Sequence, residues 1–273
     1  MPIGYVTMGN GEDYDLSKVG VIVLGSPGSL RNPGLESVHP NVRFSPPVYL
    51  PVGIKPRIGQ LFREFLLNGR FLSVGERGCS QAHINLRKEI LLSPLSWTLV
   101  LEDDVGIPLD WFRRVCEVLP EFPDDAAPGV ILLNTNPHFN LGPGVIKLNL
   151  LPSGANAFLI HRDALHNRRF DELESLERAD WPISFSSVDF WTISDIAFEI
   201  PTESRVGPRK TRRVSFLFST FVRALFSPVL SKVLGLPLGA YLSWSVVGPL
   251  KRDLALRLKR LDRRLSGSRP VSN

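Results

Sequence analysis

The sequence predicts an α/β fold with a mostly parallel sheet that is flanked by helices. Stretches of helical periodicity alternate with four short apolar runs of strand length: Val19 to Leu24, Leu99 to Leu101, Val130 to Leu133 and Ala155 to Ile160. Continuous apolar runs are typical of parallel strands that are buried on both faces. Strands that alternate with helices favour parallel pairing through right-handed crossovers.

Two helices are predicted between the first two strands. Between Ser26 and Val48 the chain is rich in Pro, Gly and Asn and is expected to be mostly loop. Apolar spacing then predicts a helix over Ile58 to Leu67 and a second one from Gly75 to about Leu92. One face of the second helix carries Cys79, His83, Leu86 and Ile90. On this apolar stripe, His83 is either a packed core residue or part of a site.

Three carboxylates, those of Glu102, Asp103 and Asp104, come directly after the second predicted strand. Ligands of α/β proteins collect at the carboxyl ends of the strands. Adjacent acids repel one another, and a divalent cation such as Mg²⁺ or Mn²⁺ relieves this repulsion and bridges to substrate phosphates. One interpretation is therefore a metal–diphosphate site. The other is that Asp103 or Asp104 caps a helix that begins near Pro108.

The helix and the acidic run together form a recognisable pattern. The chain has Gly75-x-x-Gly78-Cys79-x-x-x-His83 on the helix and then a strand that ends in Leu-Glu-Asp-Asp. This pattern resembles glycosyltransferase family 25, the enzymes of bacterial lipopolysaccharide and lipooligosaccharide assembly and their collagen-modifying animal relatives. Ala82 stands where the family usually has Ser.

The resemblance spans about residues 18 to 208, which we take as the catalytic domain. Arg31, after the first strand, is the counterpart of the family's loop arginines. Trp181 to Phe190 resembles the family's later Pro-x-Asp segment, with Asp189 as the matching acid and Ser187 in place of the Pro.

The resemblance implies a GT-A-like, Rossmann-like fold and an inverting hexosyltransferase. The donor would be a nucleotide-sugar, with UDP-galactose as the candidate, and the acceptor a lipid-linked oligosaccharide or polysaccharide. Asp189 would be the catalytic base, and Arg31, His83 and Asp103 would contact the donor. The other interpretation of Asp189 is a helix cap or a structural hydrogen bond. A divalent metal (Mn²⁺ or Mg²⁺) would assist the leaving diphosphate. Strand alternation places Asp104 and Glu102 on one side, so we favour these two as its ligands.

Trp181 and Trp191 have two interpretations, because large aromatic side chains are as common in cores as in binding sites. They either stack on the apolar face of the acceptor sugar or pack in the core.

Residues 209 to 273 are expected to form a basic, apolar helical extension. The formal net charge of +5 favours an anionic partner. Basic clusters flank the apolar stretch from Val214 to Leu250, which Pro and Gly interrupt too often for a clean membrane-spanning helix. Peripheral contact with an anionic membrane is one interpretation, and completion of the core by two short helices is the other. No nucleic acid is expected as a partner, because the tail lacks interleaved aromatic residues.

Two cysteines and the lack of a secretory signal predict a cytoplasmic protein, peripheral at the inner face of the plasma membrane. The altered first loop and Ala82 leave a second hypothesis open, a non-catalytic membrane-associated module that retains the glycosyltransferase fold. A Mg²⁺-dependent phosphohydrolase would need further acids or histidines for a second metal, and no convincing set is present.

Overall fold

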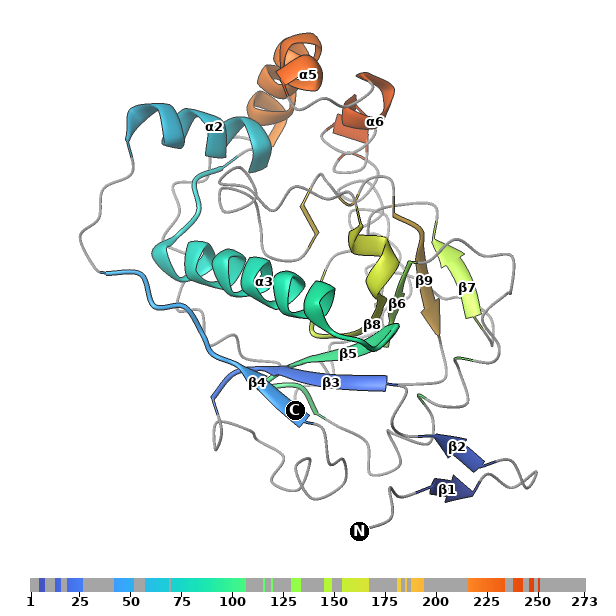
Figure 1. The fold of residues 1–273 in the computed structure, drawn as a ribbon. Coiled ribbons are helices and arrows are strands. Elements are labelled where there is room, and N and C mark those ends of the chain that lie inside the picture. Colours follow the sequence, from blue (N-terminus) through green and yellow to red (C-terminus); the bar gives the residue numbers. More distant parts are fainter. Residues whose placement is uncertain are drawn as a thin grey trace, which may run out of the picture.

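The fold is known from a computed structural model and is an α/β protein with a seven-stranded mixed sheet (Figure 1). The structure describes residues 5–7, 13–15, 19–26, 42–51, 57–68, 70–106, 115, 119, 129–133, 145–148, 154–166, 181–182, 185, 188–193, 216–233, 238–242, 246–247 and 250. A separate two-stranded antiparallel sheet is formed by β1 (Tyr5–Thr7) and β2 (Asp13–Asp15).

The strands of the large sheet follow the order β4-β3-β5-β8-β6-β9-β7. In chain order they are β3 (Val19–Leu24), β4 (Val42–Ser45), β5 (Trp97–Glu102), β6 (Val130–Leu132), β7 (Val145–Leu148), β8 (Ala157–His161) and β9 (Phe190–Ile193). The four strands predicted from apolar runs are present, and β4, β7 and β9 are additions. β4 lies inside the stretch that was expected to be mostly loop.

The sheet is less parallel than the sequence predicted. β4, β3 and β5 pair in parallel, as do β6 and β9. β8 lies antiparallel between β5 and β6, and β7 is antiparallel to β9 at the edge. The apolar run of β8 reads like that of a parallel strand because β8 is central and buried on both faces.

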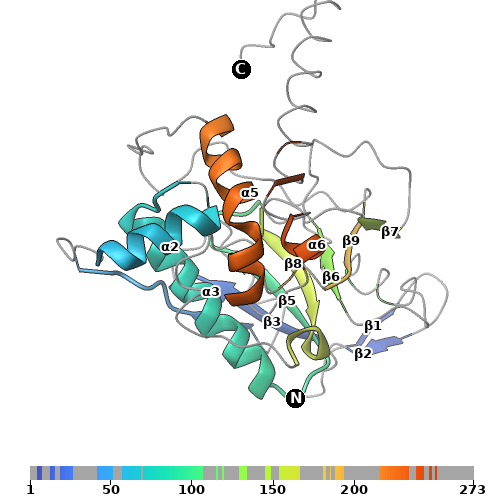
Figure 2. The ribbon, with the colours of Figure 1, turned by 90° about the horizontal axis from the view of Figure 1, so that it is seen from above.

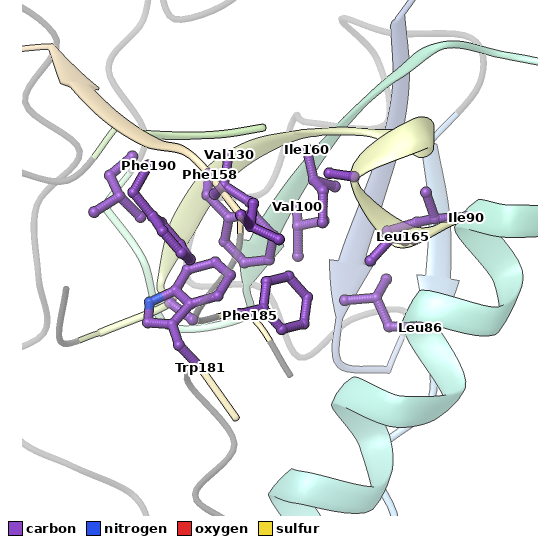
Figure 3. Packing of buried hydrophobic residues seen from close by; sticks show 14 of the residues in the cluster. Leu86, Ile90, Val100, Val130, Phe158, Ile160, Leu165, Trp181, Phe185 and Phe190 are labelled. Carbon is purple, nitrogen blue, oxygen red and sulfur yellow. The ribbon is translucent and has the colours of Figure 1, made fainter. Parts of the chain in front are cut away.

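Alternate side chains of the strands build two cores, one on each face of the sheet. Val21, Val23, Leu99 and Leu101 belong to one core. The other core joins Ile22 and Val100 with Leu86 and Ile90 of helix α3 and with a group of aromatic side chains (Figure 3). The sheet is thus covered by α3 on the second face, as the apolar stripe of this helix predicted.

Helix α3 (Val74–Leu92) begins at a capping box. Ser73 accepts a hydrogen bond from the Glu76 amide, and the Glu76 carboxylate accepts one from the Ser73 amide. Burial raises the pKa of Glu76, but hydrogen bonds from Arg70 and Ser73 and the Arg70 charge outweigh it and lower this pKa to about 2. The amino-terminal turn of α3 is therefore fixed in place by charged and capping hydrogen bonds.

Gly78 is required where α3 passes the segment after β4. A Cβ atom at this position would lie 2.3 Å from the carbonyl oxygen of Val48. We expect Gly78→Ala to lower the free energy of unfolding by about 2 kcal/mol, measured by urea denaturation, because backbone must move to admit the methyl group. Gly59→Ala is the matched control in helix α2, where nothing lies within 4 Å, and should be neutral or stabilising. Equal effects of the two substitutions would contradict this interpretation.

Two further helical layers lie outside α3. Helix α2 (Ile58–Asn68) lies beyond α3 as seen from the sheet, α5 (Phe216–Val233) lies farther out, and α6 (Leu238–Leu242) lies beside α5 (Figures 1 and 2). α5 contacts both α2 and α6. None of the helices in the described part of the chain is long and apolar enough to cross a membrane.

Candidate functional site

The acidic run begins at the carboxyl end of β5, as the sequence predicted. Every second side chain of β5 points to the face of the sheet that α3 covers, and these are Thr98, Val100 and Glu102. Because only residues 93 to 96 separate α3 from β5, β5 runs back beneath the helix. Its carboxyl end therefore lies below the amino-terminal half of α3, which carries Cys79 and His83.

Glu102 meets two residues of α3. A carboxylate oxygen of Glu102, the sulfur of Cys79 and a ring nitrogen of His83 all lie within 4.8 Å of one another. The side chain of His83 is 2% exposed, and its Nε2 lies 3.9 Å from Glu102 Oε1. That nitrogen is buried and has no hydrogen-bond partner among the described residues. A buried polar atom without a partner is costly, so this position suits an additional ligand.

Asn156 holds Glu102 in this orientation. Its Nδ2 donates to Glu102 Oε2 at 2.5 Å, and its carbonyl oxygen accepts from the Glu102 amide at 2.8 Å. Asn156 lies just before β8, the strand that pairs with β5. Sequence reasoning missed this residue, because only the pairing of two distant strands reveals it. Cys79 was not singled out as a site residue, although its i, i+4 spacing with His83 was a usable signal.

Asp103 and Asp104 follow Glu102 in a turn, and both are half-buried. The turn is closed by a hydrogen bond from the Val105 amide to the Glu102 carbonyl. Side chains no longer alternate between the two faces of the sheet once the strand ends at this turn. Alternation therefore does not place Asp104 on the same side as Glu102. The start of the helix that these acids would cap lies outside the described residues, as does Arg31.

The structure does not bring Asp189 to this site. Asp189 precedes β9, and strand register aligns it with Gly129, His161 and Trp97, at the other end of β5 from Glu102. Five residues along the strand and three strands across correspond to roughly 20 Å. The Asp189 carboxylate instead pairs with Lys147 Nζ at 2.7 Å. This placement argues against Asp189 as the base of a reaction centred on Glu102.

The tryptophans belong to the core. Trp181 packs edge-on against Phe158 and Phe190, and its indole nitrogen donates to the Gly154 carbonyl (Figure 3). Trp191 is 9% exposed and lies in the core on the opposite face, as part of β9. Of the two interpretations, core packing describes both residues, and neither presents an open face for a sugar.

The donor atoms suit a divalent cation. Carboxylates alone favour Mg²⁺ or Mn²⁺, whereas imidazole and thiolate ligands favour softer ions. Because the cluster contributes one atom of each kind, its donor set is softer than that of an all-carboxylate Mg²⁺ or Mn²⁺ site. The buried Nε2 of His83 would gain a partner from a metal ion at this position.

The comparisons with known proteins add no relative. No protein-family model matches the chain, and no curated protein matches it. The function is therefore inferred from the geometry of the site and from the motif resemblance described above.

Proposed function

We propose that the chain is a metal-dependent glycosyltransferase that moves a sugar from a nucleotide-sugar donor to a glycan or glycolipid acceptor. The observation that carries the proposal is the position of Glu102. It lies at the carboxyl end of a central strand, where α/β proteins bind ligands, and faces a buried histidine 3.9 Å away. The motif resemblance to glycosyltransferase family 25 includes both residues.

In this proposal the residues around Glu102 divide between cation and donor. The resemblance leaves all three acids of the run as candidate ligands: Glu102 and Asp104 would hold Mn²⁺, and Asp103 and His83 would contact the donor or complete the cation's ligands. A bound divalent cation offsets the negative charge that the diphosphate leaving group acquires. The proposal gives Asp189 no catalytic role, because this residue lies at the amino end of β9, away from Glu102.

Calorimetry with uridine diphosphate, with and without Mn²⁺, tests the proposal. We expect wild-type protein to bind the nucleotide only when Mn²⁺ is present, and Asp104→Ala to abolish the binding. Asp163→Ala is the matched control, because this acid is 48% exposed and lies beyond the amino end of β5. Folded wild-type protein that binds no nucleotide in either condition would exclude the proposal as stated.

A further inference from the structure

In helix α5 the buried side is polar and the exposed side is mostly apolar, which is the reverse of a typical surface helix of a soluble domain. Its buried positions include four polar residues, Thr220, Arg223, Ser227 and Ser231. Its exposed positions are mostly apolar and include Phe218, Phe221, Leu225 and Val229, which are between 58% and 66% exposed. The two sets follow i, i+3, i+7, i+11 spacing and lie on opposite sides of the helix. We call the exposed set the α5 apolar face.

Two of the inward polar groups bond within the helix itself. Ser227 Oγ donates to the Arg223 carbonyl at 2.7 Å, and Ser231 Oγ donates to the Pro228 carbonyl at 3.1 Å. These two hydroxyls therefore need no water, and the apolar side of the helix remains directed outward. An apolar partner on the outer side would remove this exposed surface from water.

Helix α2 extends the apolar face. Phe62 of α2 is 52% exposed and packs edge-on against Phe226 of α5, with ring centroids 6.2 Å apart. Ile58, one turn earlier on α2, is 87% exposed. Both helices belong to the outer layers of the molecule (Figure 2). Exposed apolar surface that continues across two helices marks an interaction site rather than scattered surface residues.

The charge of the adjoining sequence identifies the partner. Arg209, Lys210, Arg212 and Arg213 lie within seven residues before the start of α5 and carry no acid among them. After α6, the segment from Lys251 to Arg269 contains eight Lys and Arg residues against two Asp. An apolar helix face between cationic segments is complementary to an anionic bilayer, in which apolar side chains enter the acyl boundary and cations meet the headgroups.

We propose that the α5 apolar face, together with Phe62 of α2, binds the surface of an anionic lipid bilayer. The helix lies in the plane of the interface with Phe221 and Leu225 inserted. The polar residues on its other side remain toward the protein. This surface is separate from the site at Glu102, and its test contains no nucleotide or metal.

Co-flotation of the full chain with vesicles tests this surface. Wild-type protein should float with vesicles of equal parts phosphatidylcholine and phosphatidylglycerol, and far less with phosphatidylcholine alone. Phe221→Ser combined with Leu225→Ser should weaken partitioning about tenfold or more. Leu92→Ser is the matched control, because Leu92 is 87% exposed at the end of α3 and should leave partitioning unchanged.

A second variant separates the cationic segment from the apolar face. A variant with Gln at the four basic positions before α5 should lose the preference for phosphatidylglycerol and the salt sensitivity of binding. These positions are Arg209, Lys210, Arg212 and Arg213. Circular dichroism and sedimentation accompany each variant. Binding by the Phe221/Leu225 variant that equals wild type would overturn the proposal, as would wild-type protein that does not float. If wild-type protein formed dimers without lipid, and only the Phe221/Leu225 variant disrupted them, a second copy of the chain would cover the face instead of a bilayer.

Discussion

Glu102→Gln is expected to weaken Mn²⁺-dependent binding of uridine diphosphate at least about 100-fold, while the protein remains folded. The substitution keeps the shape of the side chain but removes the charge that faces His83 Nε2. Three adjacent carboxylates repel one another, so the metal-free variant should be as stable as wild type or slightly more stable. Calorimetry measures the binding, and urea denaturation without metal measures the stability.

The split between binding and stability is what distinguishes a ligand site from a structural one. Asn156→Ala should weaken the same binding about tenfold, because Asn156 only orients the Glu102 carboxylate. Asn85→Ala is its matched control, since Asn85 is exposed on α3. If Glu102→Gln lowered stability and left nucleotide binding intact, Glu102 would be a structural residue of the α3–β5 contact.

The elements that the sequence predicted share a strong local signal. α2, α3, β3 and β5 show long helical periodicity or continuous apolar runs, and their ends agree with the structure to within about two residues. β4 and β7 each have four residues and include a charged one. β9 also has only four residues and directly follows Asp189. Such short strands are defined by their neighbours in the sheet and not by their own composition.

The site was predictable only where one local segment defines it. Glu102 at the end of a strand and His83 on the preceding helix are close in sequence, and a short connection brings them together. Asp189 and Asn156 depend on strand order and direction. Because β8 is antiparallel to β5, its amino end and Asn156 lie beside Glu102. Because β9 is parallel to β6, Asp189 lies at the amino ends of these strands, away from Glu102. Neither direction is encoded in local periodicity.

Glu64→Ala is expected to lower the free energy of unfolding by about 3–5 kcal/mol. The Glu64 side chain is 1% exposed and accepts from Arg77 Nε at 3.0 Å, Arg77 Nη2 at 2.8 Å and the Leu72 amide at 2.9 Å. Removing it leaves a largely buried guanidinium and a buried amide without their acceptor. Urea denaturation followed by circular dichroism measures the loss.

Two comparisons show whether this effect comes from burial of the ion pair. Asp189→Ala breaks the Lys147 pair, whose side chains are 49% and 32% exposed, and should cost no more than about 1 kcal/mol. Glu64→Leu combined with Arg77→Leu removes both charges and should recover the part of the stability that the unpaired Arg77 charge costs, while the Leu72 amide still lacks its acceptor. A double variant as unstable as the single one would instead assign the effect to packing between α2 and α3. Because Arg77 lies two residues before Cys79, this ion pair joins α2, which carries part of the proposed membrane surface, to the helix that positions the candidate site.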